Sequence, residues 1–282
     1  MKVRIIVDST ADVSEKIRGR LTVVPLTVHF GDEEYIDGVT ISRQEFYEKL
    51  IESDVLPSTS QATPAAFASV FAEVAANSES AVVLTISSKL SGTYQSAMIA
   101  AEDYPDNIFV VDGKSAATGS GILAELALRL ADSGMEAKEI ADRLTEEREN
   151  VCLIALLDTL EYLKRGGRIS KAVAFAGGIL SIKPVIGLRE GEVIMLGKAR
   201  GSKQGNNLLI KEIEEAGGVD YEKPVLLGYS GLSDLLLQKY IADSATLWEG
   251  KVTELHTTQI GSVIGTHAGP GAIVATFFKR KN

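Results

Sequence analysis

The segment from Gly261 to Gly271 places a histidine, His267, among glycines and hydroxyl-bearing residues. Glycines permit positive φ values and let a ligand approach the backbone closely. Pro270 restricts the backbone just before the last predicted strand, Ala272–Phe278. The imidazole can donate a hydrogen bond whether it is neutral or charged. The pattern predicts a glycine-rich turn that presents a polar group, and a plain surface turn is the alternative.

A second polar segment, residues 87–97, follows the apolar run Ala81–Ile86 and precedes a helical pattern. At the start of a helix, unpaired N–H groups and the positive end of the helix dipole favour an anion. Ser91 and Gly92 stand at this position. The segment therefore predicts an anion-binding loop.

Hydroxyl groups also gather in residues 57–64, ahead of a helix expected to begin near Pro64. Capping the helix requires only one or two of them. Thr59 and Ser60 are therefore candidates for binding a ligand.

Basic residues surround a Gly166–Gly167 turn after a short predicted helix. Lys164, Arg165 and Arg168 would complement the helix dipole, and they are also candidates for an exposed surface that docks an acidic partner. Lys183 and Arg200 lie further along the chain; they are either head-group contacts or solvated surface residues.

These donors suit an ionised carboxylate, which accepts hydrogen bonds from hydroxyls, from a backbone N–H and from an imidazole. Thr59, Ser60, Ser91, Gly92 and His267 form the expected set. The rival hypothesis is a serine hydrolase, in which Ser91 is the nucleophile and His267 is the general base. The chain has neither a Gly-x-Ser-x-Gly elbow nor an obvious acid to orient the histidine. No spacing of His, Cys, Asp or Glu indicates a metal site.

The elements that must position these residues divide near residue 150. In residues 1–150, short apolar strands alternate with helices, which predicts a doubly wound, mostly parallel α/β sheet. This region includes a single strand expected over residues 23–30. Residues 151–282 contain a probable hairpin, Pro184–Leu188 with Val193–Leu196, and further strand–helix pairs. They predict a smaller α+β domain, with the ligand between the two domains.

Composition limits the classes of partner. The chain has 282 residues, 45% of them hydrophobic, and a formal charge of −9, which argues against a nucleic-acid partner. One cysteine, Cys152, allows no intramolecular disulfide. No apolar run is long enough to cross a membrane, and the first residues do not resemble an export signal. A cytoplasmic location is expected.

Six segments together resemble the DegV family of bacterial fatty-acid-binding proteins. They are Asp8–Asp12, Thr59–Gln61, Ser88–Gln95, Leu163–Ile169, Ile182–Pro184 and Gly265–Gly271. They occur in the family's order along the whole chain. One departure is that Ala62 and Thr63 separate the Thr-Ser-Gln triplet from Pro64, where the family often has proline directly after the triplet.

The resemblance implies a non-catalytic carrier without a cofactor. It implies that the carrier holds a long-chain fatty acid and presents its carboxylate to a separate ATP-dependent fatty acid kinase, for phospholipid synthesis. The acyl tail would run into a tunnel of the second domain, for which the segment with Phe175, Ile179 and Leu180 is the candidate, although an ordinary buried helix fits it equally. The chain has no phosphate-binding loop of its own. A lipid sensor or storage protein without a kinase remains open.

Overall fold

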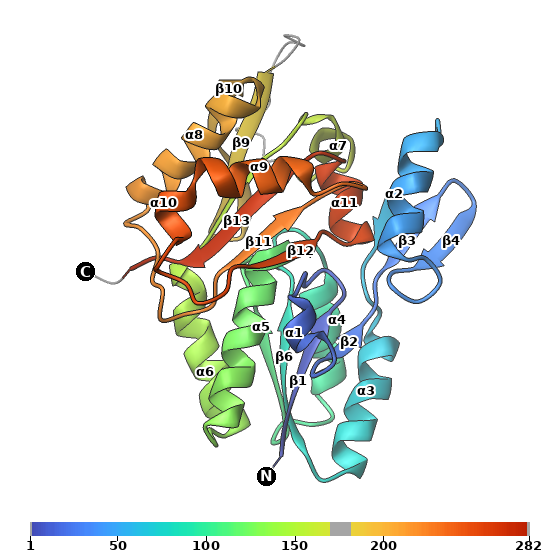
Figure 1. Cartoon of the computed structure of the whole chain (residues 1–282). Coiled ribbons are helices and arrows are strands. Elements are labelled where there is room, and N and C mark those ends of the chain that lie inside the picture. The colour runs from blue at the N-terminus through green and yellow to red at the C-terminus, as the bar shows by residue number, and fades with distance from the viewer. Residues whose placement is uncertain (1, 170–181, 281–282) are drawn as a thin grey trace.

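The computed structural model describes residues 2–169 and 182–280. Its first sheet contains parallel strands in the order β2-β1-β6-β7 (Figure 1). Their bounds are β1 (Val3–Asp8), β2 (Thr22–Val24), β6 (Ser80–Thr85) and β7 (Ile108–Asp112). The short continuous apolar runs that predicted a parallel sheet are these strands, which confirms that prediction.

Helices cover both faces of this sheet. Ile5 and Val7 of β1 pack with α5 (Ala117–Asp132) and α6 (Ala137–Glu147). Ile6, between them, packs on the opposite side with α3 (Pro64–Ala76) and α4 (Thr93–Ala101). Successive side chains of a strand point to opposite faces, so a strand buried on both sides must be apolar throughout.

A small antiparallel sheet, in the order β4-β3-β5, interrupts this pattern. It is formed by β3 (Thr27–Phe30), β4 (Glu33–Ile36) and β5 (Ser58–Ser60). The prediction of a single strand over residues 23–30 is therefore wrong: this segment forms two strands, β2 and β3, which belong to different sheets. Pro25 lies between them, and because proline has no N–H to donate, it marks the point where a strand ends.

The second large sheet has the order β10-β9-β8-β13-β11-β12 and is mixed. The predicted hairpin is confirmed as the antiparallel pair β9–β10, with Glu190 and Gly191 at its turn. The strands are β8 (Val151–Leu156), β9 (Ile182–Arg189), β10 (Glu192–Arg200), β11 (Leu226–Tyr229), β12 (His256–Gln259) and β13 (Ile273–Phe278).

The two faces of this second sheet have different neighbours. Ile154 and Leu156 of β8 belong to a core shared with α8 (Gly201–Glu215), α9 (Leu235–Asp243) and α10 (Ala245–Trp248). Leu153 and Ala155 face the opposite side, where Ala117 of α5 also packs. Helix α5 therefore lies between the two large sheets (Figure 1).

Short helices complete the fold and lead to the polar residues of interest. They are α1 (Glu15–Arg18), α7 (Glu161–Arg165), α11 (Ser262–Ala268) and the 3-10 turn η1 (Arg148–Asn150), besides the longer α2 (Arg43–Glu52). The glycine-rich turn predicted over residues 261–271 is wrong in part. Its first seven residues after Gly261 form α11, and His267 lies in the last turn of that helix.

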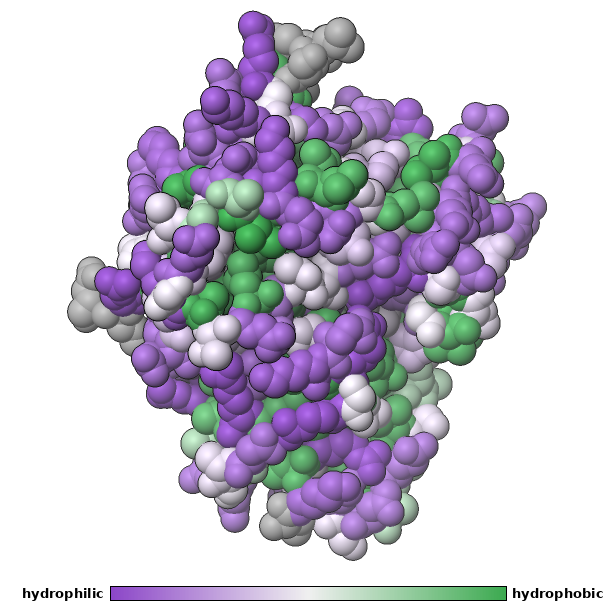
Figure 2. All heavy atoms as spheres, in the orientation of Figure 1, coloured by the Kyte–Doolittle hydropathy of each residue, from purple (hydrophilic) through white to green (hydrophobic). Residues whose placement is uncertain are grey.

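The surface is mainly polar in the view of Figure 2, where hydrophobic atoms form only separate patches. Within the described residues, no helix is both long and apolar enough to cross a membrane. The same residues contain no group of His, Cys, Asp or Glu side chains that could hold a metal ion.

Candidate functional site

A cavity of about 380 Å³ is lined by strands of the second large sheet, by β5 of the small sheet, by α11 and by the segment that follows β6. This volume falls within the range of roughly 300–1,000 Å³ that is typical of small-molecule sites. Its walls are largely aliphatic, and its polar side chains are concentrated in a few segments. The lining residues with polar side chains are Thr59, Ser60, Gln61, Ser91, Arg168 and His267.

The structure brings together all five residues expected to bind a carboxylate. Thr59 and Ser60 belong to β5, Ser91 and Gly92 precede α4, and His267 belongs to α11. The small sheet carries β5 to this position because β5 pairs with β3. Five residues from three separate segments therefore line one cavity. The family motifs that singled them out in the sequence are far apart along the chain.

His267 is held in place by two residues distant in the sequence, Thr59 and Gly166. Its Nε2 lies 3.0 Å from Thr59 Oγ1, and its Nδ1 is buried without a hydrogen-bond partner among the described residues. Gly166 packs directly against this ring, where a Cβ atom would collide with Nδ1. Burial, and to a smaller extent the nearby Arg168 charge, lower the pKa of His267 to about 4. The imidazole is therefore neutral at neutral pH, with one N–H to donate.

Ser91, in the loop expected to bind an anion, is fixed by a neighbouring hydroxyl. Ser91 Oγ lies 2.9 Å from Thr93 Oγ1 and accepts a hydrogen bond from Thr93 N. Thr93 begins α4, so Ser91 acts at the start of that helix as expected. The Ser91 hydroxyl, which lines the cavity, can turn its hydrogen toward a ligand when Thr93 Oγ1 is the donor in their mutual bond.

Gln61 also lines the cavity, although it is not among the residues expected from the sequence to bind the carboxylate. Its Nε2 donates to Ser96 Oγ at 2.9 Å, and its amide lies against Gly92, where a side chain would collide with it. Gly92 thus has no side chain because Gln61 occupies that space. The signal was present in the sequence, since Gln61 belongs to the Thr-Ser-Gln triplet.

The three candidate cations lie in different places. Arg168 lines the cavity and is half-buried, with Nε donating to Leu90 O at 3.0 Å and Nη1 to Gly166 O at 2.8 Å. It is therefore not the fully exposed side chain that a pure docking surface would require. Lys183 pairs with Asp158 at 2.5 Å. Neither Lys183 nor the exposed Arg200 is among the residues that line the cavity.

The apolar part of the cavity is built mainly from strands of the second sheet. Phe175, Ile179 and Leu180, the tunnel candidates from the sequence, lie outside the described residues. The aliphatic lining residues of the described part include Leu153, Ala155, Leu157, Leu163, Ile186, Leu188, Val193, Ile260, Ile264 and Val274. The sequence did not identify them, because an apolar strand residue has the same pattern whether it faces a cavity or a filled core.

Relatives of known structure share this architecture. A fatty-acid-binding DegV family protein from Thermus thermophilus has a TM-score of 0.88 and 32% identity, with 99% of this chain and 100% of that chain covered. A stearic acid-binding protein from Eubacterium ventriosum has a TM-score of 0.87 and 28% identity, with 98% of both chains covered. A fatty-acid-binding DegV from Bacillus subtilis has a TM-score of 0.84 and 28% identity, with 99% and 100% covered.

The sequence comparisons agree. A DegV domain-containing protein from Caldanaerobacter subterraneus is 35% identical over 285 residues, with 99% of each chain covered. The model of the DegV family matches residues 2–280. On the fold, on these relatives and on the family match, this chain belongs to the DegV family.

Proposed function

We propose that this protein binds one long-chain fatty acid, with the acyl tail in the aliphatic part of the cavity and the carboxylate at the polar lining formed by Thr59, Ser60, Ser91, Gly92 and His267. The observation that carries this proposal is the lining itself: hydroxyl groups, the backbone of Gly92 and an imidazole meet one cavity whose other lining residues are mostly aliphatic. A long-chain fatty acid has the same division between a polar group and an apolar chain.

The acyl tail would supply most of the binding free energy. Burial of roughly 14 methylene groups at ~0.8 kcal/mol each contributes on the order of 11 kcal/mol before the costs of association are deducted. A dissociation constant of about 1 μM corresponds to roughly 8 kcal/mol, so micromolar or tighter binding is expected. The head-group contacts then set the orientation of the ligand in the cavity.

The charge balance of the site also favours an anion. His267 is neutral, because burial lowers its pKa to about 4, and it supplies a hydrogen bond but no charge. Arg168 is the cation among the cavity-lining residues that the structure describes. A carboxylate near it would be compensated by a charge-assisted interaction, which is stronger than a neutral hydrogen bond.

We further infer that the carrier presents this carboxylate to a separate ATP-dependent fatty acid kinase in the cytoplasm, for phospholipid synthesis. Ser60 and Gln61, which line the cavity, are also exposed at the surface, so the polar lining reaches solvent where a partner can approach. In that reaction a carboxylate oxygen attacks the γ-phosphorus of ATP, which forms an acyl-phosphate and releases ADP. Lys164 and Arg165 are exposed beside Arg168 and could steer an acidic partner.

The geometry opposes the hydrolase alternative. His267 Nε2 is bonded to Thr59 Oγ1 and Ser91 Oγ to Thr93 Oγ1, so the hydrogen bonds of the two residues lead to other partners. Among the described residues nothing bonds His267 Nδ1, so no acid orients the ring. A pKa of about 4 also makes His267 a weak general base at neutral pH.

Organic extraction of purified protein, followed by mass spectrometry, tests the binding step. We expect about one acyl chain per protein molecule, although no fatty acid was added during purification. A protein that yields no acyl chain, and that binds no fatty acid after delipidation, would contradict the proposal. Incubating loaded carrier with a purified kinase and labelled ATP tests the second step. If no acyl-phosphate forms in that incubation while fatty acid stays bound, the kinase step is contradicted and a lipid sensor or storage protein is the remaining interpretation.

A further inference from the structure

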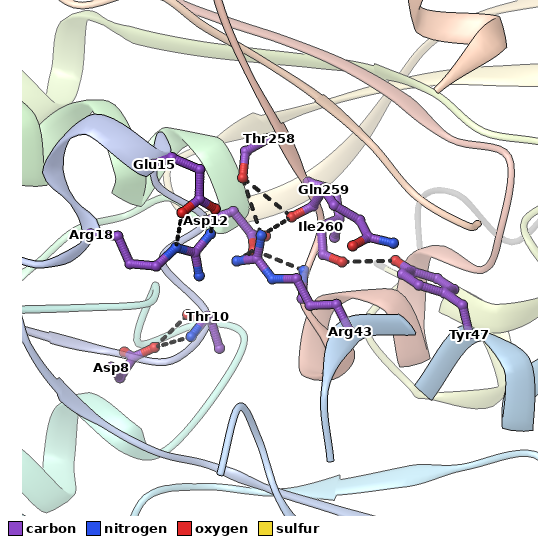
Figure 3. A network of polar contacts seen from close by, with 11 residues as sticks. Asp8, Thr10, Asp12, Glu15, Arg18, Arg43, Tyr47, Thr258, Gln259 and Ile260 are labelled. Atoms are coloured by element: carbon purple, nitrogen blue, oxygen red, sulfur yellow. Dashed lines mark hydrogen bonds and ion pairs between the residues drawn. The ribbon is translucent and has the colours of Figure 1, made fainter. Parts of the chain in front are cut away.

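A buried polar network joins the first half of the chain to the start of α11, the helix that carries His267 (Figure 3). Asp12 is fully buried, and its Oδ1 accepts a hydrogen bond from Gly261 N at 2.8 Å. Gly261 is the residue that precedes α11. Asp12 therefore satisfies a backbone donor at the helix start from 249 residues away in the sequence.

Arg43, at the start of α2, connects Asp12 to β12. Its Nη2 pairs with Asp12 Oδ1 at 2.9 Å, and its Nη1 donates to Thr258 Oγ1 at 3.1 Å and to the carbonyl of Gln259. One guanidinium thus bonds to both sides of the boundary between the two halves of the chain. Because its fork geometry is fixed, it also holds these groups in one arrangement.

A second buried carboxylate, Asp37, lies on the same helix start. It is 6% exposed and faces the hydroxyl and backbone N–H of Ser262, the first residue of α11. A Cβ atom on Gly261 would lie 3.2 Å from Asp12 Oδ1 and 3.9 Å from Asp37 Oδ2. Negative charge at this end of a helix is favourable because of the helix dipole.

The opposite end of α11 contributes to the ligand cavity. Ile264, His267 and Ala268 all line it. Between the two ends, α11 packs closely on α2: a Cβ atom on Gly265 would lie only 2.7 Å from the Tyr47 hydroxyl oxygen. Tyr47 in turn donates to Ile260 O at 3.1 Å. A shift of the helix start would therefore be transmitted to His267.

We propose that Asp12, together with Arg43 and Asp37, positions α11 and thereby sets where His267 stands relative to the ligand head group. Asp12 is a positioning residue and does not touch the ligand: it is not among the residues that line the cavity. The inference rests on the proposed function, since it assigns a role to the same site. It adds three residues whose side chains lie outside the cavity.

Titration of Asp12 makes the role measurable. Its pKa is raised to about 7, mainly by burial and in part by Asp37, against the lowering effects of Arg43, the Gly261 N–H and Arg18 of α1. Tyr47 of α2 also faces this carboxyl. Above pH 7 Asp12 is ionised and attracts both Arg43 and the helix start. Below pH 7 it gains a proton and this attraction weakens, while His267, with its pKa near 4, stays neutral.

Affinity and stability should therefore change in opposite directions with pH. Because the folded-state pKa of Asp12 is raised, the folded protein takes up its proton more readily than the unfolded chain. The contribution of Asp12 to the free energy of unfolding thus falls as the pH rises from about 4 to about 7. Ligand affinity should instead rise through pH 7. A general loss of folding would lower both quantities together.

The test is a fluorescent 16-carbon fatty acid titrated at pH 6.0 and 8.0 into delipidated protein. We expect binding to be about fivefold tighter at the higher pH, the size typical of one partly buried charge–dipole contact. Asp12→Asn keeps the shape but removes the charge, so its binding should be weak at both pH values. Glu147→Gln is the matched control: Glu147 is also buried and paired, with Lys223, and lies outside the cavity lining. It should keep the wild-type profile.

Hydrogen exchange of the ligand-free protein gives a readout that does not depend on binding. The amide of Gly265 donates to Gly261 O at 2.8 Å. It should exchange faster in Asp12→Asn than in wild type, and at the wild-type rate in Glu147→Gln. If wild type binds no fatty acid, the proposed function fails, whereas the exchange result still decides whether Asp12 holds α11. Wild-type exchange and wild-type affinity in Asp12→Asn would overturn the inference.

If Asp12→Asn does not fold, Arg43→Lys decides. Lysine keeps the positive charge but cannot reach Asp12 and Thr258 together with a planar fork. It should weaken binding in the same direction and retain the pH dependence, because Asp12 remains. Unchanged affinity in Arg43→Lys would count against the positioning role.

Discussion

His267 is the residue on which the proposed carboxylate site depends most directly. Its ring is fixed by Thr59 on one side and by Gly166 on the other, and it is neutral because burial lowers its pKa to about 4. A neutral donor gives direction without adding a buried charge, which would need its own partner. Arg168 then supplies the charge beside it.

His267→Ala should weaken fatty-acid binding by about 1–3 kcal/mol, or roughly 5- to 150-fold in dissociation constant, because one hydrogen-bond donor is lost from a partly buried site. The fold should remain. Titration of delipidated protein with a fluorescent fatty acid measures the change. His256→Ala is the control, since His256 lies at the start of β12 and outside the cavity lining. Equal effects of both substitutions would remove His267 from the site.

Arg168→Ala should weaken fatty-acid binding by at least about tenfold, because charge-assisted contacts contribute roughly 1.5–3 kcal/mol. The sequence alone favoured a docking role, in which binding would stay near wild type. The half-buried position at the cavity changes that expectation. Lys164→Ala removes an exposed neighbouring cation and should leave binding unchanged. Wild-type binding in Arg168→Ala, with loss of kinase turnover alone, would restore the docking interpretation.

The polar lining residues of the cavity could be predicted from the sequence and its aliphatic lining could not, for a physical reason. Ser91 and Thr59 are polar residues in segments that need few polar side chains, so they stand out against the local pattern. Leu153 and Val274 do not, because both cavity walls and filled cores are made of apolar strand residues. Only the packing of the two sheets decides which of them faces empty space.

At the level of elements, α11 shows how packing overrides a local pattern. Glycines at 261, 265 and 269 favour a turn, yet the chain forms a helix there. Gly265 is present because α2 lies so close that no side chain fits, and Gly269 ends the helix with a φ of 71°. The glycines are visible in the sequence, but the close packing that excludes a side chain at Gly265 comes from α2, more than 200 residues earlier.

Gly265→Ala tests this contact between helices. A Cβ atom would lie 2.7 Å from the Tyr47 hydroxyl and 2.8 Å from Phe46 Cε1, so α2 must move. We expect a loss of about 1–3 kcal/mol in the free energy of unfolding, as for overpacked cores, measured by denaturant titration. Gly19→Ala is the control, because nothing lies within 4 Å of its Cβ position and its φ is −71°. Similar losses in both variants would show that the contact is not the cause.

For the whole molecule, the cavity lies where the two halves of the chain share their packing. Helix α5 contacts strands of both large sheets, and Thr118 of α5 bonds to Thr276 of β13. We propose residues 1–150 and 151–282 as two structural units that share this helix. A ligand between them touches strands and helices of both, so binding should stabilise the molecule as a whole.

Adding fatty acid to delipidated protein should therefore raise its melting temperature. At 100 times the dissociation constant the gain is ~2.7 kcal/mol, which corresponds to roughly 5 °C for a chain of this size. The methyl ester of the same fatty acid has the same tail but no charge. At equal concentration it should give a clearly smaller shift, because the charge-assisted contacts to the head group are lost. Equal shifts would mean that the tail alone is recognised, and no shift with either ligand would remove the lipid site itself.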